Sequence, residues 1–304
     1  MTDPAQARTN GTAVDQKVWF ITGTSSGFGR RLVTIALGRG DLVIATARSQ
    51  EKLEALVNSY DTKLRDNLRT IQLDVTEGVE SITRKAEIAN GFWGRIDVLV
   101  NNAGVGYPAI AEEGGSSWLR KQFETNVFGV MDVTTAVLPH LRRRRSGTVV
   151  VIGSRSAWRT DIPGSGGYAA SKAAIHAITE NLAVELASFN IRVLLVAPGS
   201  FRTEGILGQS YHLSNQIADY DALRQASHAR FKSIPGTEKG DPDKAMEAVA
   251  DVVRGEGFAT GKPWPDVLIL GNDAAADVQA KFQHTLDLLD SWKDVTYNVN
   301  FDSQ

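Results

Sequence analysis

The feature that most constrains the fold is a strand, a glycine turn and a helix that follow one another near the amino terminus. Lys17 to Thr22 is an apolar run typical of a strand, and it leads through the stretch 23–29 into a helical pattern. Gly23, Gly27 and Gly29 let the backbone approach a phosphate closely, and the start of the helix offers unpaired N–H groups. We therefore expect a dinucleotide site here.

The rest of the chain repeats this alternation. Apolar runs typical of buried strands are followed by longer patterns typical of helices. Strands without a polar face belong to sheets that helices cover on both sides, which predicts an α/β fold with a doubly wound parallel sheet in a single domain. The expected strands are Lys17–Thr22, Asp41–Thr46, Thr70–Leu73, Val98–Val100, Val149–Ile152, Ile191–Ala197 and Val267–Leu270. Helices are expected at 82–89, 118–123, 126–141, 173–189, 222–231, 244–254 and 274–292, with a break or bend near Thr125.

One domain accounts for the whole pattern. A chain of 304 residues with 42% hydrophobic residues can bury one sizeable core. Residues 1–16 are polar and small, so we expect a disordered lead there and one domain over residues 17–304. From about 200 to 265 the pattern weakens, and the place of this segment after a sheet strand predicts a lid over the substrate.

Composition excludes several classes of protein. The formal net charge of -2 shows no bias toward nucleic acid or anionic membranes, and the absence of cysteine excludes disulfides and thiolate metal sites. No apolar run reaches the roughly 18–20 residues of a membrane span, and the amino-terminal stretch lacks a signal-peptide core. A cytoplasmic protein is expected.

The histidines and one run of arginines receive structural interpretations. The five histidines show no metal-ligand spacing, and His140 and His176 are expected on helix surfaces. Residues 142–145 are four arginines at the end of a predicted helix, where cations meet the negative end of the helix dipole. We interpret them as a solvated helix end and not as a nucleic-acid patch.

A serine, a tyrosine and a lysine are expected to lie together. Ser154 follows the strand 149–152, at the sheet edge where ligands bind. Tyr168 and Lys172 are four residues apart and share one helix face. The lysine cation is expected to bring the pKa of the tyrosine down from about 10 toward working pH. A serine that bonds the substrate oxygen and a tyrosine that exchanges its proton suit hydride transfer between a carbonyl compound and an alcohol, without a metal.

The end of the second strand favours NADP(H), with NAD(H) possible. Arg48 stands where a carboxylate would bond a free ribose hydroxyl, and an arginine pairs with a 2′-phosphate instead. Asp74 and Val75 follow the third strand, where the carboxylate can meet the adenine amino group or cap a helix.

Two further polar stretches are expected near the cofactor. Asn101-Asn102-Ala103-Gly104 follows the fourth strand, and its small residues let the chain pass close to the cofactor. Asn126 lies in apolar surroundings, as a structural plug or as part of a polar relay, and the spacing leaves both open.

Together these motifs resemble the short-chain dehydrogenase/reductase family over roughly Lys17 to Leu270. The stretches KVWFITGTSSGFGR, RIDVLVNNAG, VLPHL and APGSFRTE are most similar to the branch of 17β-hydroxysteroid and retinol dehydrogenases. The resemblance implies a Rossmann-like fold and a bulky apolar ketone or secondary alcohol as substrate.

The resemblance also implies roles for single residues. Tyr168 would be the acid and base, and Lys172 would tune it and hold the nicotinamide ribose. Ser154 would orient the substrate oxygen, and Asn126 would anchor a water for proton relay. Thr203 would touch the nicotinamide amide. The implied cofactor-binding residues are Gly23, Ser25, Ser26, Gly27, Phe28, Gly29, Arg48, Asp74, Val75, Asn102, Ala103, Gly104, Tyr168, Lys172, Pro198, Gly199 and Thr203.

One spacing departs from the family. The interval from Ser154 to Tyr168 is one residue longer than usual, which makes Ser156 a rival for the serine role. Ser154 is preferred because it follows the strand directly.

We predict an NADP(H)-dependent ketoreductase or alcohol dehydrogenase for a small-molecule substrate. The alternative is an NADP(H)-sensing binding protein without turnover, against which the intact Tyr168 and Lys172 count. An epimerase or dehydratase is disfavoured because no sugar-nucleotide domain is present. The apolar surface of helices 126–141 and 173–189 predicts a homodimer or homotetramer.

Overall fold

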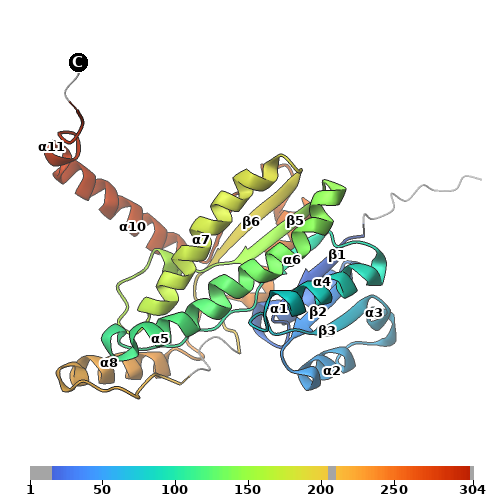
Figure 1. Ribbon diagram of the computed structural model, residues 1–304, viewed down its shortest axis with the longest axis horizontal. Coiled ribbons are helices and arrows are strands. Elements are labelled where there is room, and N and C mark those ends of the chain that lie inside the picture. Colours follow the sequence, from blue (N-terminus) through green and yellow to red (C-terminus); the bar gives the residue numbers. More distant parts are fainter. Residues whose placement is uncertain (1–15, 205–209, 302–304) are drawn as a thin grey trace, which may run out of the picture.

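Seven parallel strands form the centre of the molecule in the computed structural model, which describes residues 16–204 and 210–301 (Figure 1). Every strand predicted from the sequence is present, with ends within two residues of the expected ones. The predicted lead over residues 1–16 lies, apart from Gln16, outside the described residues. The strands are β1 (Val18–Ile21), β2 (Leu42–Ala47), β3 (Leu68–Gln72), β4 (Val98–Asn101), β5 (Gly147–Ile152), β6 (Ile191–Pro198) and β7 (Val267–Leu270).

The order of the strands creates a ligand edge. The sheet runs β3-β2-β1-β4-β5-β6-β7, and β1 pairs in parallel with β2 on one side and β4 on the other. The strand order therefore reverses between β1 and β4, and loops leaving these strands diverge to opposite faces. The carboxyl ends of all seven strands meet at the same edge.

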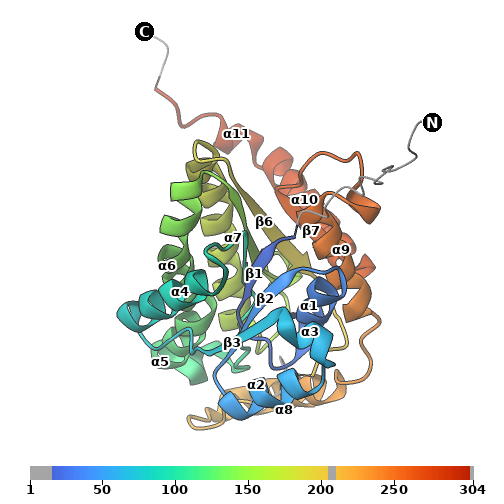
Figure 2. The same cartoon turned by 90° about the vertical axis from the view of Figure 1, so that its right-hand side faces the viewer.

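Helices cover both faces of the sheet, which confirms the doubly wound single domain. Figure 2 shows α4, α6 and α7 over one face and α1 and α9 over the other. The helices of eight or more residues are α1 (Gly27–Gly38), α2 (Gln50–Asn58), α4 (Val79–Trp93), α5 (Ala111–Phe123), α6 (Gly129–Arg144), α7 (Gly166–Ala187), α8 (Asp221–Ser233), α9 (Pro242–Arg254) and α10 (Asn272–Ser291), and the short ones include α3 (Thr62–Asp66) and α11 (Lys293–Thr296).

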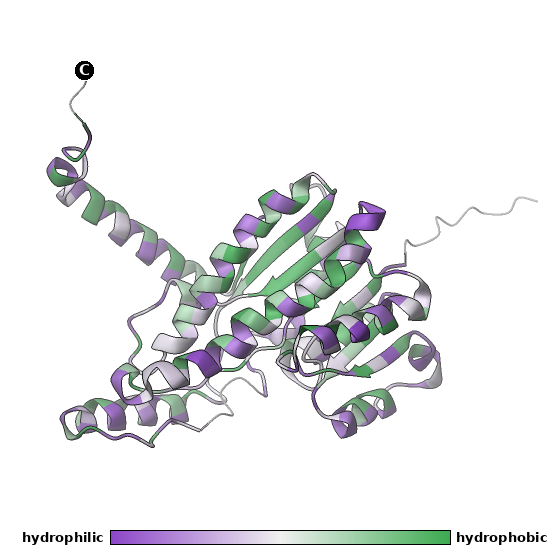
Figure 3. Cartoon of the chain, viewed as in Figure 1, coloured by the Kyte–Doolittle hydropathy of each residue, from purple (hydrophilic) through white to green (hydrophobic). Residues whose placement is uncertain are grey.

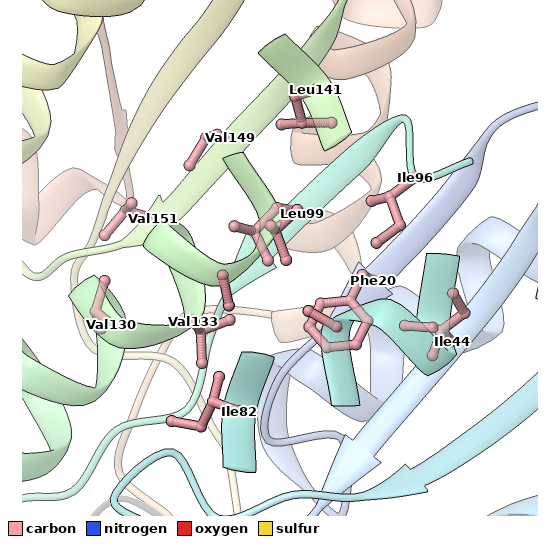
Figure 4. Packing of buried hydrophobic residues seen from close by; sticks show 14 of the residues in the cluster. Phe20, Ile44, Ile82, Ile96, Leu99, Val130, Val133, Leu141, Val149 and Val151 are labelled. Carbon is pink, nitrogen blue, oxygen red and sulfur yellow. The ribbon is translucent and has the colours of Figure 1, made fainter. Parts of the chain in front are cut away.

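Each strand contributes to two cores because alternate residues point to opposite faces. Phe20 and Leu99 pack with Ile82 and Val133 between the sheet and the helices α4 and α6 (Figure 4). The neighbouring Trp19 belongs to the second core, under α1 and α9. The strands are hydrophobic over most of their length (Figure 3), as burial on both faces requires.

Two helices between β2 and β3 are not predicted from the sequence, and one predicted bend is present. The sequence pattern does not predict α2 and α3, because they are short and bury few apolar residues; their starts are capped by Ser49 and Asp61. The expected bend near Thr125 is present as a π-helical turn over Glu124–Phe128, between α5 and α6.

The prediction that His140 lies on a helix surface is wrong. Its side chain is buried where α6 packs on α4, with Nε2 3.4 Å from a carboxylate oxygen of Glu87. The arginines do end α6 as predicted, and most of them have structural contacts. Arg142 and Arg145 lie over the ring of Phe189, and Arg144 pairs with Asp97.

A buried ion pair joins the start of β2 to the end of α9. The carboxylate of Asp41 is fully buried and accepts hydrogen bonds from Arg254 at 2.6 and 2.9 Å. The same carboxylate accepts the indole N–H of Trp19 at 2.8 Å and the backbone N–H of Lys17 at 2.9 Å. This one side chain therefore fixes β1, β2 and α9 to one another.

The carboxyl-terminal helix α10 extends away from the body of the molecule (Figure 1). Its first turns are attached, with Ala274 buried and Asp277 paired with Arg155 at 2.6 Å. From Gln279 onward the described residues are exposed, including the apolar Phe282, Leu286 and Trp292. Within the described residues, no helix has the length and hydrophobicity to cross a bilayer.

Candidate active site

A cavity of about 1990 Å³ opens at the carboxyl edge of the sheet. The strand ends at Ile21, Ala47, Asn101, Ile152 and Pro198 lead into the loops that surround it. All the predicted site residues line this cavity except Gly29 and Asn126. The structure thus brings together groups from seven separate stretches of the sequence.

The glycine turn between β1 and α1 has the backbone that only glycine adopts easily. Gly23 and Gly27 have φ values of 70° and 59°, in the left-handed region. Gly29 lies behind the cavity wall, where a Cβ atom would come within 2.5 Å of the Gly23 carbonyl oxygen and of Asn102 Nδ2. The Asn102 amide donates to the carbonyls of Thr22 and Gly23 at 2.8 and 3.0 Å. The Asn-Asn-Ala-Gly stretch, predicted to pass close to the cofactor, thus lies against the glycine turn.

A carboxylate binds the start of α1. The backbone N–H of Gly27 donates to Glu204 at 2.8 Å, and Arg31 forms an ion pair with the same carboxylate at 2.9 Å. The hydrogen bond from Arg31 lowers the pKa of Glu204 to about 2. The sequence assigns no role to Glu204, although the stretch APGSFRTE ends with it, because its partner lies far along the chain. Its contact shows that this turn accepts an anionic group.

Arg48 and Asp74 lie at the far end of the cavity, beyond β2 and β3. The Arg48 side chain is exposed, and no hydrogen bond or ion pair of its guanidinium is found among the described residues. Asp74 accepts the backbone N–H and the hydroxyl of Thr76 at 2.9 and 2.8 Å. It caps the turn that precedes α4, while it also lines the cavity.

Ser154, Tyr168 and Lys172 meet at the end of β5. Ser154 follows the strand, and the helix α7 carries the other two residues on one face. The Ser154 hydroxyl lies close enough to the Tyr168 phenol to lower its pKa. Lys172 is buried, and its ammonium donates to the Ile152 carbonyl at 2.7 Å and lies 5.8 Å from the centre of the Tyr168 ring.

Burial, and not the lysine charge, dominates the acidity of the tyrosine. Desolvation raises the pKa of Tyr168 to about 12, although the Ser154 hydroxyl acts in the opposite direction. Desolvation also lowers the pKa of Lys172 to about 8. The expectation that the lysine brings the tyrosine pKa down toward working pH is therefore wrong for this structure. A half-buried phenol in these surroundings keeps its proton.

The two candidate serines have different partners. Ser154 is buried beside Tyr168, and its hydroxyl oxygen accepts the backbone N–H of Ser156 at 3.1 Å. Ser156 lies on the short turn that follows and lines the cavity as well. The contact with the tyrosine favours Ser154.

Asn126 acts in this structure as a structural plug. Its side chain is buried in the π-helical turn, accepts the backbone N–H of Val105 at 2.9 Å and donates to the Val105 carbonyl at 2.9 Å. It also donates to the Ser171 hydroxyl at 3.1 Å. These bonds hold the loop after β4 against α7.

His176 is the second histidine whose predicted surface position is wrong. It is 5% exposed, and its Nε2 atom accepts the backbone N–H of Ser154 at 3.1 Å. The error has a physical cause: the face of α7 that carries Tyr168 and Lys172 continues to His176, and the loop after β5 covers all of it.

The segment predicted as a lid forms one wall of the cavity. Tyr211 and Phe231 have ring centres 6.1 Å apart, and both line it together with His228. A buried ion pair between Arg224 and Glu113 ties α8 to α5.

Comparisons with known proteins agree with this geometry. The model of the family described as short chain dehydrogenase matches residues 17–209. The oxidoreductase BOA17 of Botryotinia fuckeliana is 32% identical over 281 residues, which cover 92% of this chain and 98% of the relative. Retinol dehydrogenase 7 of Rattus norvegicus is 34% identical over 254 residues, covering 80% and 74%.

Solved structures match over most of the chain as well. A short-chain dehydrogenase from Streptomyces avermitilis is 36% identical, with a TM-score of 0.81 and coverage of 94% of this chain and 100% of that one. A serine dehydrogenase complexed with NADP+ is 28% identical, with a TM-score of 0.65 and coverage of 83% and 93%. A 3-ketoacyl-(acyl-carrier-protein) reductase from Brucella melitensis complexed with NADH is 25% identical, with a TM-score of 0.68 and coverage of 85% and 97%. This chain belongs to the short-chain dehydrogenase family of oxidoreductases.

Proposed function

We propose that the protein is an NADP(H)-dependent oxidoreductase that interconverts a ketone and a secondary alcohol, with Tyr168 as acid and base. The observation that carries this proposal is that Ser154, Tyr168 and Lys172 line the large cavity together at the end of β5. Two hydroxyl groups placed together can hold one carbonyl oxygen between them.

The glycine turn fits a nicotinamide dinucleotide. The Gly27 N–H lies at the start of α1, where the positive end of the helix dipole favours an anion, and a diphosphate would replace the Glu204 carboxylate that this N–H binds here. Ser25, Ser26 and Thr203 line the cavity beside it and would hold the cofactor with the turn. Related structures with NADP+ and with NADH support this cofactor class for both forms. When bound, the nicotinamide would supply or accept the hydride.

The protein's own groups divide the handling of the proton. With a pKa of about 12, Tyr168 stays protonated near neutral pH and can donate its proton to the oxygen of a ketone under reduction. Ser154 orients that oxygen. Lys172, which is charged below its pKa of about 8, stabilises the phenolate that remains.

The preference for NADP(H) rests on Arg48 and yields a prediction. Arg48→Ala is expected to weaken NADPH binding by roughly 10- to 100-fold, because a hydrogen bond to a charged group contributes about 1.5–3 kcal/mol. Binding of NADH should change by less than about 2-fold, since NADH lacks the 2′-phosphate. Titration of each nucleotide with the protein, followed by the change in nucleotide fluorescence, measures the dissociation constants for NADPH and NADH.

Arg84→Ala is the matched control for that titration, because Arg84 is an exposed arginine on α4 that does not line the cavity. Equal affinities for the two nucleotides, unaltered in Arg48→Ala, would reject the NADP(H) preference.

The wall of the cavity favours a bulky apolar substrate. Tyr211, Leu213 and Phe231 line it on the side of the proposed lid, and Ile162 lines it from the loop before α7. The similarity to a retinol dehydrogenase supports the same class. We propose that the segment from about 200 to 265 selects the substrate.

Oxidation of NADPH over a panel of ketones, followed at 340 nm, tests the proposed function. We expect turnover with large apolar ketones and little with short polar ones. A protein that binds NADPH tightly and turns over no ketone or alcohol would instead be the nucleotide-sensing binding protein.

We also propose that the protein is a homo-oligomer that works in the cytoplasm. Phe128 at the start of α6 and Val184 on α7 are 51% and 75% exposed, and exposed apolar residues on these two helices are expected to pack against a second copy. Light scattering at micromolar concentration should give at least twice the mass of one chain, 32.9 kDa. A mass of one chain would reject the oligomer.

A further inference from the structure

We propose that His176 is a positioning residue of the active site, whose imidazole accepts the backbone N–H of Ser154 and so sets the turn that presents the Ser154 hydroxyl to Tyr168. The inference goes beyond the proposed function to a residue that touches no reacting atom. The test by kcat rests on the proposed function, and the test by hydrogen exchange does not.

The helix α7 places three functional groups in a row. Tyr168, Lys172 and His176 follow one another at intervals of four residues, so they lie on one face of the helix. The Ser154 N–H donates to His176 Nε2 at 3.1 Å. Because a backbone N–H can only donate, Nε2 carries no proton and the imidazole proton lies on Nδ1. Nδ1 is buried without a hydrogen-bond partner among the described residues, so Nε2 makes the polar contact of this ring.

The imidazole also fills the space beneath the turn. A Cβ atom on Gly153 would lie 2.2 Å from His176 Nε2, so the ring packs directly on the backbone before Ser154. The Trp158 ring closes the other side, with ring centres 4.9 Å apart in an edge-to-face arrangement. Gly153 itself donates to the Val196 carbonyl at 2.7 Å. The turn is therefore held from β6 and from α7 at once.

The serine hydroxyl is fixed as a consequence. Its backbone N–H is held by His176, and its Oγ atom accepts the N–H of Ser156 at 3.1 Å. With both ends fixed, the hydroxyl is held beside Tyr168, whose pKa it lowers. Positions of reacting groups that shift by about 1 Å can lower a rate by about 100-fold.

The electrostatics of the site require a neutral acceptor at this position. Burial and then the charge of Lys172 lower the pKa of His176 to about 4, so the imidazole is uncharged at neutral pH. A carboxylate here would compete for the lysine ammonium, and an aliphatic side chain would leave the Ser154 N–H buried without an acceptor. An uncharged imidazole provides the acceptor and does not compete with the Ile152 carbonyl for the Lys172 ammonium.

The test compares His176→Leu, which removes the acceptor, with His176→Gln, whose amide oxygen can restore it. Thr179→Val is the control, because Thr179 is buried one turn further along α7 and its hydroxyl bonds only the Ile175 carbonyl of its own helix. We expect H176L to lower kcat by about 10- to 100-fold, while its KM for NADPH stays within about 2-fold of the parent value. The kcat of H176Q should lie within about 5-fold of the parent value. The kcat of T179V should equal that of the parent.

Hydrogen exchange of the Ser154 amide, followed by NMR, needs no substrate. We expect slow exchange in the parent and in H176Q, and exchange at least about 10-fold faster in H176L. Parental kcat in folded H176L, a loss in H176Q equal to that in H176L, or a Ser154 amide that exchanges freely in the parent would each overturn the inference. If H176L does not fold, the kcat of H176Q and the exchange rate of the Ser154 amide in the parent test the inference. A parent that reduces no ketone rejects the proposed function and leaves the exchange measurement intact.

Discussion

Tyr168→Phe is expected to lower kcat for ketone reduction by about 10²- to 10⁴-fold while NADPH binding stays within about 2-fold of the parent. General acid catalysis by a placed side chain contributes a factor of this size, and phenylalanine removes the proton while it keeps the ring. The loss is about 3–5 kcal/mol of transition-state stabilisation. Steady-state rates at saturating NADPH measure it.

Tyr60→Phe is the matched control for this experiment. Tyr60 also has a buried hydroxyl, bonded to Thr34 at 2.7 Å, but it lies under α1 and does not line the cavity. Removal of the Tyr60 hydroxyl should leave kcat unchanged. A Tyr168→Phe protein that reduced ketones as fast as the parent would remove the acid and base role, and with it the proposed mechanism.

Asp41→Ala is expected to lower the free energy of unfolding by about 3–5 kcal/mol. The substitution removes the buried carboxylate that accepts both hydrogen bonds of Arg254 Nη1, leaving the largely buried guanidinium with Glu256, and it removes the acceptor of the Trp19 indole N–H. Breaking one partner of a buried pair is costly because the remaining charge cannot return to water. Urea denaturation followed by tryptophan fluorescence measures the change.

An exposed acidic residue provides the comparison. Asp290 pairs with Lys293 on the exposed part of α10, and surface pairs of this kind contribute about 0–1 kcal/mol. Asp290→Ala should therefore change the unfolding free energy by no more than about 1 kcal/mol. A loss for Asp41→Ala of that same small size would show that the pair does not hold β2 to α9.

The sequence predicts the fold well because its strands are buried on both faces. Runs such as Val149–Ile152 contain no polar residue that could blur the strand pattern, and the spacing of Tyr168 and Lys172 determines their shared helix face. The helix α2 escapes prediction because it buries only Leu53 and Leu56.

The parts of the site that escape prediction depend on contacts between distant segments. Glu204 reaches the Gly27 N–H across 177 residues, and no local pattern encodes that pairing. His176 is buried because the turn after β5 folds over α7, which a helical pattern by itself does not indicate. The pKa of Tyr168 follows from its loss of water, so the spacing to Lys172 predicts a nearby cation but the wrong direction of the shift.

The attachment of α8 has a consequence for how such a protein can diversify. The wall that α8 contributes is tied to the body through the Arg224–Glu113 pair, whereas Ser154 and Tyr168 stand on β5 and α7. The residues that shape the cavity wall and the residues that handle the proton thus lie in different portions of the polypeptide. A lineage can remodel the wall to admit a new molecule and leave the proton-handling groups untouched.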